Sequence, residues 1–146
     1  MRVQNRYSMK RIFLVIGFLA VSVGFSKAQC NADSFTTTCI PKLAEGFNFL
    51  KGYKIDGQNG GKAKVEYSYV FTKGTQYMIN ICSGKAGDIV INLFDSKRNR
   101  VASSKIGDQY ATAIAFPCKS TSIYYISYTF SDGSGYCGGS ALGFKR

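Results

Sequence analysis

From residue 53 onward the chain is a succession of short segments rich in Val, Ile, Tyr, Phe and Thr, separated by Gly, Asp, Asn, Ser and Lys. Such segments, with turn-forming residues between them, are typical of β-strands. No segment of helix length separates them, which argues against a βαβ fold. The pattern predicts strands over 49–55, 64–72, 76–82, 88–95, 100–105, 110–117, 122–130 and 136–144.

Alternation within these segments predicts which side chains face the core. In 88–95, Ile89, Ile91 and Leu93 share one side of the strand, whereas Val90, Asn92 and Phe94 lie on the other. Several segments are apolar on both sides at one end, as suits a strand between two layers. About eight short strands with this spacing predict an all-β fold: a two-sheet antiparallel β-sandwich, jelly-roll-like in topology.

The segment 29–52 lacks this pattern, and we interpret it as an irregular lead-in to the sandwich. Pro41 is suited to open a short N-terminal helical turn that continues through Leu43, Ala44 and Phe47.

The first 28 residues have the layout of a signal peptide. A basic start is followed by an apolar run over 12–24, and the small residues Ser26 and Ala28 precede a cleavage site between Ala28 and Gln29. Met9, followed by two basic residues, offers an alternative start with the same outcome. We therefore expect an exported protein, located in the periplasm, on the cell surface or outside the cell.

A membrane anchor and a lipoprotein are the alternatives to cleavage after Ala28. The apolar run is shorter than the roughly 20 residues that cross a bilayer, so we expect no membrane span after cleavage. Lipidation of Cys30 ranks third, because Lys27 and Gln29 are poor residues for the positions just before a lipidated cysteine.

Cleavage would leave residues 29–146, a usual size for a single domain. The full chain has a formal net charge of +11, but the signal peptide removes five of its 19 basic residues, leaving 14 against 8 acidic ones, or +6. The densest basic cluster is Lys97, Arg98 and Arg100 at an expected turn. A cluster of three charges is typical of a solvated turn and argues against nucleic acid as a partner.

Resemblances to known proteins rest on the aromatic strands. The stretches Tyr67–Tyr77, Asp88–Asp95 and Ile123–Tyr128 resemble bacterial pre-peptidase C-terminal domains, with a Gly-x-x-Tyr hairpin, a Leu-x-Asp strand end and a Tyr-Tyr-Ile strand. That resemblance covers roughly residues 63–144. It implies a jelly-roll-like accessory or binding module of the kind appended to secreted hydrolases, although this chain shows neither a catalytic domain nor an acidic calcium-binding linker.

A second resemblance covers nearly all of residues 29–146. The segment Tyr-Ser-Tyr-Val-Phe and the terminal Cys-Gly and Leu-Gly-Phe segments are similar to sequence motifs of small exported bacterial proteins of unassigned function. It implies a stand-alone exported protein and assigns no activity.

Five cysteines follow the cleavage site, and an oxidising compartment favours their pairing. In a jelly roll the third and eighth strands are antiparallel neighbours, which predicts a bridge between Cys82 and Cys137. Cys30 and Cys39 would then close a small N-terminal loop, leaving Cys118 as a free thiol. We expect no metal at these cysteines, because the chain contains no histidine and no Cys-x-x-Cys pair.

The residue types that usually carry catalysis are scarce. Without histidine the commonest general base is missing, and no Ser-x-x-Lys spacing or phosphate-binding glycine loop occurs. A pair of carboxylates that assembles in space stays open as a hydrolytic site. The acids are Asp33, Glu45, Asp56, Glu66, Asp88, Asp95, Asp108 and Asp132.

Strand tyrosines are the candidate binding residues. Alternation places Tyr124 and Tyr128 on one face and Tyr125 on the other, so that an exposed ring could stack on a sugar or contact a protein. Asp56, Asp88 and Asp132 lie beside glycine-rich turns but lack the regular acidic loop of a calcium site, and we expect neither metal nor cofactor.

The sequence thus favours an exported, non-enzymatic binding or accessory module with a glycan or a protein as ligand. The alternative is a structural component of the cell envelope that associates through its odd cysteine. A carboxylate-dependent hydrolase ranks third.

Overall fold

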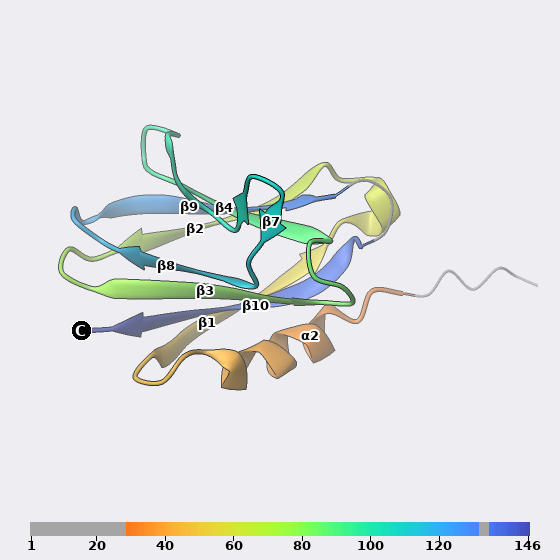
Figure 1. The fold of residues 1–146 in the computed structure, drawn as a ribbon, viewed down its shortest axis with the longest axis horizontal. Coiled ribbons are helices and arrows are strands. Elements are labelled where there is room, and N and C mark those ends of the chain that lie inside the picture. Colours follow the sequence, from red (N-terminus) through yellow and green to blue (C-terminus); the bar gives the residue numbers. More distant parts are fainter. Residues whose placement is uncertain (1–28, 132–134) are drawn as a thin grey trace, which may run out of the picture.

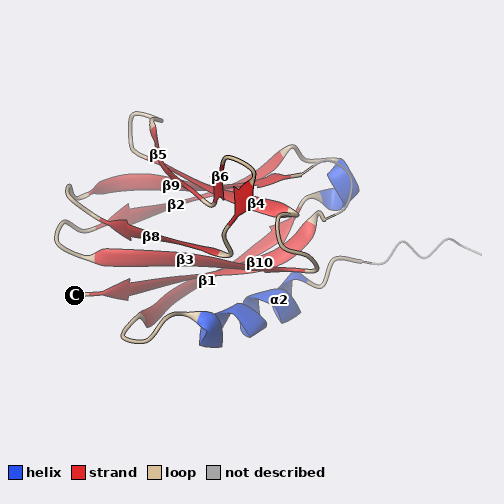
Figure 2. Ribbon diagram, viewed as in Figure 1, coloured by secondary structure: helices blue, strands red, loops and turns tan. Residues whose placement is uncertain are grey.

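The expected strand segments pair into two four-stranded antiparallel sheets in the computed structural model, which describes residues 29–131 and 135–146. Figures 1 and 2 show the two sheets as stacked layers. Sheet I has the order β1 (Asn48–Asp56), β10 (Cys137–Lys145), β3 (Gln76–Ser83), β8 (Ala113–Pro117). Sheet II has the order β2 (Lys64–Phe71), β9 (Ser122–Phe130), β4 (Ile89–Phe94), β5 (Arg100–Ser103).

This topology is a jelly roll. Apart from the step from β4 to β5, successive strands of the two sheets alternate between them. The third and last strands of the sandwich, β3 and β10, are antiparallel neighbours, as the sequence predicts. The predicted fold class, an all-β two-sheet sandwich, is confirmed.

The core between the sheets follows the predicted alternation. Ile89, Ile91 and Leu93 point inward from β4 and are buried. The ring of Phe71 stacks on Tyr77 with 3.9 Å between ring centroids, and on Tyr124 with 4.9 Å. Each large apolar side chain buried in this way stabilises the fold by about 1.5–3 kcal/mol.

The lead-in contains a helix that the sequence analysis did not predict. Helix α2 (Ala32–Cys39) is followed by the 3-10 turn η1 (Ile40–Lys42), in which Pro41 takes the expected place. The side chain of Asn31 caps α2 by accepting a hydrogen bond of 3.3 Å from the backbone nitrogen of Ser34. The helix escaped prediction because residues 36–38 are all threonine, a residue of low helix propensity.

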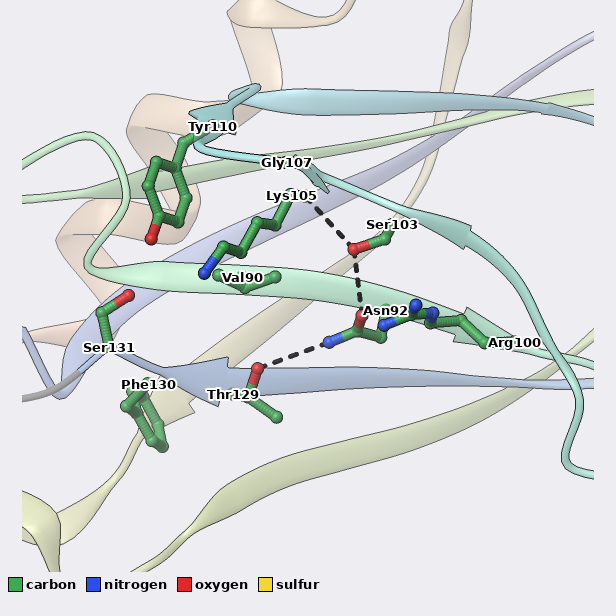
Figure 3. A pocket seen from close by; sticks show the side chains of 10 residues that line it. All are labelled: Val90, Asn92, Arg100, Ser103, Lys105, Gly107, Tyr110, Thr129, Phe130 and Ser131. Carbon is green, nitrogen blue, oxygen red and sulfur yellow. Dashed lines mark hydrogen bonds between the residues drawn. The ribbon is translucent and has the colours of Figure 1, made fainter.

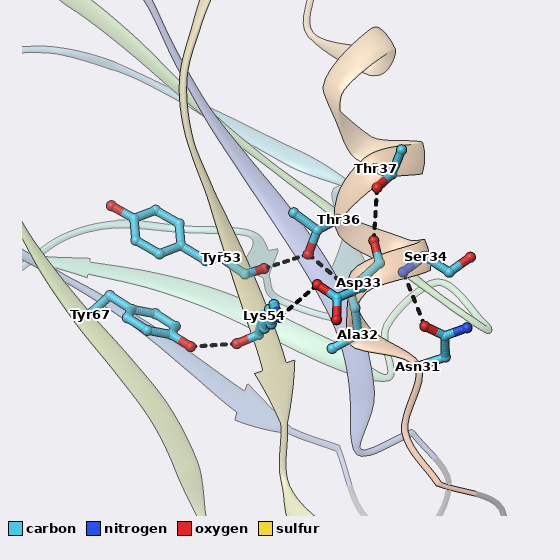
Figure 4. A network of polar contacts seen from close by, with 9 residues as sticks. All are labelled: Asn31, Ala32, Asp33, Ser34, Thr36, Thr37, Tyr53, Lys54 and Tyr67. Atoms are coloured by element: carbon cyan, nitrogen blue, oxygen red, sulfur yellow. Dashed lines mark hydrogen bonds and ion pairs between the residues drawn. The ribbon is translucent and has the colours of Figure 1, made fainter.

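Helix α2 packs on the outer face of sheet I, along β1 and β10 (Figure 1). The approach is close because Gly139 of β10 lies under the helix, where a Cβ atom would overlap the backbone of Thr36. Thr36 Oγ1 donates hydrogen bonds of 2.8 Å to the carbonyl of Ala32 and 3.1 Å to that of Tyr53 (Figure 4). The absence of a side chain at Gly139 lets the helix approach the strand, and the partly buried hydroxyl of Thr36 bonds the helix to β1.

The disulfides differ from the predicted pairing. Cys30 is bonded to Cys137 and Cys39 to Cys82, so each end of α2 is attached to sheet I. The predicted bridges Cys82–Cys137 and Cys30–Cys39 are wrong. In the register of β3 and β10 it is Gly139 that lies opposite Cys82. The bridge to β10 comes from Cys30, just before helix α2, and the bridge to β3 comes from Cys39, the last residue of the helix. Cys118 is the free cysteine, and it is buried.

Two short helical or strand-like features complete the described part of the chain. The 3-10 turn η2 (Gln58–Gly60) follows β1, and the hairpin of β6 (Lys105–Ile106) and β7 (Gln109–Tyr110) lies between β5 and β8. The predicted signal peptide, residues 1–28, lies outside the described residues. Within the described ranges, no helix has the length and apolar character that a bilayer crossing requires.

Candidate binding groove

The outer faces of the two sheets differ in what covers them. Helix α2 covers part of sheet I, whereas no helix of the described residues packs on sheet II (Figure 2). Strand register places polar side chains side by side across this open face: Ser127 of β9 lies between Glu66 of β2 and Asn92 of β4. One register step of two residues further, Thr129 lies between Lys64 and Val90.

The β6–β7 hairpin raises one wall beside this face. Ser104, 1% exposed, anchors it to β4, because its Oγ accepts a hydrogen bond of 2.8 Å from the Ile91 nitrogen and its nitrogen donates one of 2.9 Å to the Ile91 carbonyl. The Ser104 carbonyl accepts a further bond of 2.8 Å from the nitrogen of Ala111. The segment therefore leaves the sheet at a fixed point, and Lys105 and Tyr110 stand along the hollow (Figure 3).

Between this wall and the sheet lies a hollow of about 520 Å³, a usual size for a ligand pocket. Its floor is a chain of hydrogen bonds: Ser103 Oγ donates to Asn92 Oδ1 at 3.0 Å, and Asn92 Nδ2 donates to Thr129 Oγ1 at 3.3 Å (Figure 3). Each of these three polar groups keeps further hydrogen-bonding capacity, so the floor can contact a polar ligand.

A second hollow of about 260 Å³ adjoins the first, and both are lined by Asn92 and Thr129. It extends over Ser127 to Glu66 and Arg98. We call the two hollows together the sheet II groove. Its most informative lining residues are Lys64, Glu66, Asn92, Arg98, Arg100, Ser103, Lys105, Tyr110, Ser127 and Thr129.

Glu66, in the second hollow, is neutralised by its neighbours. Its carboxylate accepts hydrogen bonds from Arg98 at 2.7 Å and from Lys64 at 3.1 Å. The hydrogen bond from Arg98 is the main reason why the pKa of Glu66 lies below its ordinary value. Arg98 in turn lies over the ring of Tyr125, with 3.6 Å between the guanidinium carbon and the ring centroid.

The predicted basic cluster lies at a turn between β4 and β5. Asp95 Oδ1 accepts hydrogen bonds from the nitrogens of Lys97 at 2.9 Å and Asn99 at 2.8 Å, which shape the turn. Arg98, at the tip, has a φ of 67°. This conformation turns its side chain back toward Glu66 rather than out into a cationic patch with Lys97.

The candidate tyrosines have three different environments. Tyr124 and Tyr128 are 6% and 0% exposed in the core, so the prediction that they contact a ligand is wrong. They lie on the inward face because β9 is a central strand of sheet II, covered by sheet I on that side. Tyr125 does lie on the outer face, but Arg98 covers its ring. The aromatic residue that lines the groove is Tyr110, 41% exposed.

Most residues of the groove were missed by the sequence analysis. One signal was present: Asn92 interrupts an otherwise apolar strand on its outward side, and Ser127 and Thr129 do the same on the strand that pairs with it. The spacing of these polar residues follows the alternation of a strand, which marks a polar stripe on one face.

The structure brings two predicted acids into another cavity. Asp56 and Asp88 line a hollow of about 230 Å³ beside the Cys30–Cys137 disulfide. The carboxylate of Asp56 accepts a hydrogen bond of 2.8 Å from the Gln58 nitrogen and so shapes the turn after β1. Asp132 lies outside the described residues. Over the described ranges, no cluster of three or more Cys, Asp or Glu side chains has a metal-binding arrangement.

The comparisons with known proteins give a likeness of fold. No protein-family model matches the chain, and no curated protein matches its sequence. One similar solved structure is PliG of Aeromonas hydrophila, a periplasmic inhibitor of g-type lysozyme, with 14% identity over 70% of this chain and 91% of that one and a TM-score of 0.46. Another is the pre-peptidase C-terminal domain of a collagenase from Bacillus anthracis, with 15% identity over 65% and 86% and a TM-score of 0.45.

Proposed function

We propose that the protein is an exported, non-enzymatic binding module that holds a glycan or protein ligand in the sheet II groove. In this proposal residues 1–28 are the signal peptide and residues 29–146 are a single binding domain. The observation that carries the proposal is the hydrogen-bonded chain of Ser103, Asn92 and Thr129 on the floor of an open hollow.

The low exposure of the floor's polar groups supports binding, because the polar residues of an ordinary outward sheet face are solvated. Asn92 is 8% exposed and Ser127 2% exposed, although both point away from the core. Amides and hydroxyls that are walled in by their neighbours, yet open toward one side, are typical of sites that orient a polar ligand.

Two features support the exported and non-enzymatic parts of the proposal. Four of the five cysteines form disulfides, which persist in oxidising compartments. Among the described residues that line the groove, the single carboxylate is Glu66, and it is held by two cations. A hydrolytic carboxylate pair has no counterpart there.

The alternative, an envelope component that associates through its odd cysteine, is weakened by the position of Cys118. The side chain is 4% exposed and its Sγ donates to the carbonyl of Ser120 at 3.1 Å. A thiol in this position reaches another chain only after local unfolding.

The test fills the groove and measures binding. Purified protein covering residues 29–146 is screened against immobilised glycans and envelope proteins, and Thr129→Tyr is screened beside it. Thr129 lines both hollows and its side chain points outward, so a tyrosine there occupies the groove without entering the core. We expect every saturable ligand of the parent protein to lose at least tenfold in affinity.

The control is Ser68→Tyr, which adds the same ring to the same face outside both hollows, where Ser68 is exposed. It should bind like the parent protein, and circular dichroism should show both variants folded. Equal loss in the two variants, or full binding by Thr129→Tyr, would place the ligand elsewhere and contradict the proposal.

A further inference from the structure

The geometry points to an acidic oligosaccharide as the ligand of the sheet II groove, with its carboxylate or sulfate groups bound by Arg100 and Lys105. This inference rests on the proposed function and deepens it by naming the ligand class.

Among the described residues that line it, the larger hollow carries positive charge and no carboxylate to compensate it. Arg100 and Lys105 both line it, and no carboxylate among the described residues does. Neither cation forms an ion pair within the described part of the chain, unlike Lys64 and Arg98, which bind Glu66. The charge in the larger hollow is therefore available to an anionic ligand, whereas that of the smaller one is partly neutralised. A guanidinium suits bidentate recognition of planar acidic groups.

The two cations lie on either side of the polar floor. Arg100, on β5, lies opposite Phe94 of β4, and Lys105 comes two residues after Ser103, whose side chain is part of the floor. Figure 3 shows Arg100 at one end of the hollow and Lys105 with Tyr110 at the other, with Asn92, Ser103 and Thr129 between them. Acidic groups spaced along one ligand can thus meet both cations while the stretch between them contacts hydroxyls and an amide.

The floor fits a sugar better than an extended peptide. A peptide that adds to a sheet needs a free strand edge for main-chain hydrogen bonds. Of the three strands that make the floor, β5 is an edge strand, whereas β4 and β9, which carry Asn92 and Thr129, are the central strands of sheet II and are paired on both edges. Only side chains are available to the ligand there: amide and hydroxyl groups, which suit sugar hydroxyls, and the exposed ring of Tyr110, which suits a sugar face.

The experiment compares matched ligands by titration calorimetry on residues 29–146. Tetragalacturonic acid is the acidic probe, and its methyl ester is the neutral control of the same length and hydroxyl pattern. A sulfated tetrasaccharide derived from heparin distinguishes sulfate from carboxylate as the acidic group, and tetraglutamate represents an acidic peptide. We expect at least one acidic sugar to bind at least tenfold more tightly than the ester and than tetraglutamate.

The matched variants carry the same change of charge in two places. Arg100→Gln/Lys105→Gln removes both cations of the larger hollow, whereas Lys73→Gln/Lys119→Gln removes two exposed cations from loops outside the groove. Loss of charge-assisted hydrogen bonds should weaken the acidic sugar about tenfold or more in the first variant. The second variant should bind within twofold of the parent protein.

Each other outcome overturns the inference. Equal weakening by both double variants would show unspecific attraction of charge, and tighter binding of tetraglutamate would show a peptide site. Failure of both acidic sugars to bind at millimolar concentration would contradict the ligand class. If instead the ester bound as well as the acid, and Thr129→Tyr abolished the binding of both, the acidic ligand class would be wrong and the proposed function would stand.

Discussion

The hydroxyl of Tyr128 donates a hydrogen bond of 2.7 Å to Oγ of Ser140, and this bond joins the two sheets inside the core. Both side chains are 0% exposed, Tyr128 on β9 of sheet II and Ser140 on β10 of sheet I. Tyr53, 2% exposed in the same core, has a hydroxyl without a hydrogen-bond partner among the described residues. Of these two buried tyrosines, Tyr128 thus has a hydrogen-bond partner for its hydroxyl and Tyr53 has none among the described residues.

The two tyrosines predict opposite effects of the same substitution. Tyr128→Phe leaves Ser140 without its donor in a dry environment and should lower the free energy of unfolding by about 1 kcal/mol. Tyr53→Phe removes a polar atom that was buried without compensation, so the stability should stay equal or rise. Urea unfolding followed by circular dichroism measures both changes. Equal loss of stability in the two variants would contradict the assignment of partners.

The disulfides predict large and separate effects on stability. Cys39 and Cys82 are separated by 43 positions in the sequence, and Cys30 and Cys137 by 107. On the chain-entropy model, replacing both cysteines of a pair by alanine should lower the free energy of unfolding by about 4 kcal/mol for the shorter loop and about 5 kcal/mol for the longer one. Denaturant unfolding of the two double variants provides the measurement.

The control for this comparison is Cys118→Ala, which removes a cysteine that forms no bridge. Its loss of stability should be far smaller than that of either double variant. Peptide mapping of the unreduced parent protein checks the pairing directly, and a fragment joining Cys82 to Cys137 would show the bridges to be those of the sequence-based prediction instead.

Gly139 predicts a packing effect under helix α2. In Gly139→Ala the added methyl group meets the backbone of Phe35 and Thr36, which cannot move aside like a flexible side chain. Because disulfides hold both ends of the helix, the strain stays at the contact, and the free energy of unfolding should fall by about 1–3 kcal/mol. Thermal unfolding measures this. Gly84→Ala, at an exposed position with open space around the new methyl group, should stay within about 0.5 kcal/mol of the parent.

The strands could be predicted from the sequence, whereas helix α2 could not. The strands are recognisable from local patterns, because each segment carries its own alternating apolar residues and is bounded by turn residues. Helix α2 is stabilised instead by a distant contact, Thr36 against Gly139 and Tyr53, while its own threonines disfavour a helix. Once the helix was missed, the pairing of Cys39 with Cys82 could not be deduced.

The groove shows the same limit. Outward Asn92 was visible in the alternation of its strand, but the hollow depends on which strands pair and in which register. It also depends on the hairpin that Ser104 anchors to Ile91. The tyrosines of the strand at 122–130 suggested a binding face, but Tyr124 points inward from β9, toward the side that the other sheet covers.

Glu66 predicts a pH-dependent contribution to stability. Its pKa is lowered in the folded protein from the ordinary value of about 4.5, mainly by the hydrogen bond from Arg98. A carboxylate whose pKa is lowered on folding stabilises the protein above its unfolded-state pKa, and this contribution is lost as the pH falls through the folded-state pKa. Since Arg98 and Lys64 are about half exposed, the contribution should be below about 1 kcal/mol.

Glu66→Gln tests this by urea unfolding at several pH values. At pH 7 the variant should be less stable than the parent, and the gap should close in acid, as the pH falls through the lowered pKa of Glu66 and that residue of the parent becomes protonated. High salt at pH 7 should narrow the gap as well, because the partners are solvent-exposed. A gap that stays constant from pH 7 to pH 3 would mean that Glu66 acts through its shape and not its charge, and that the smaller hollow is not neutralised by this ion pair.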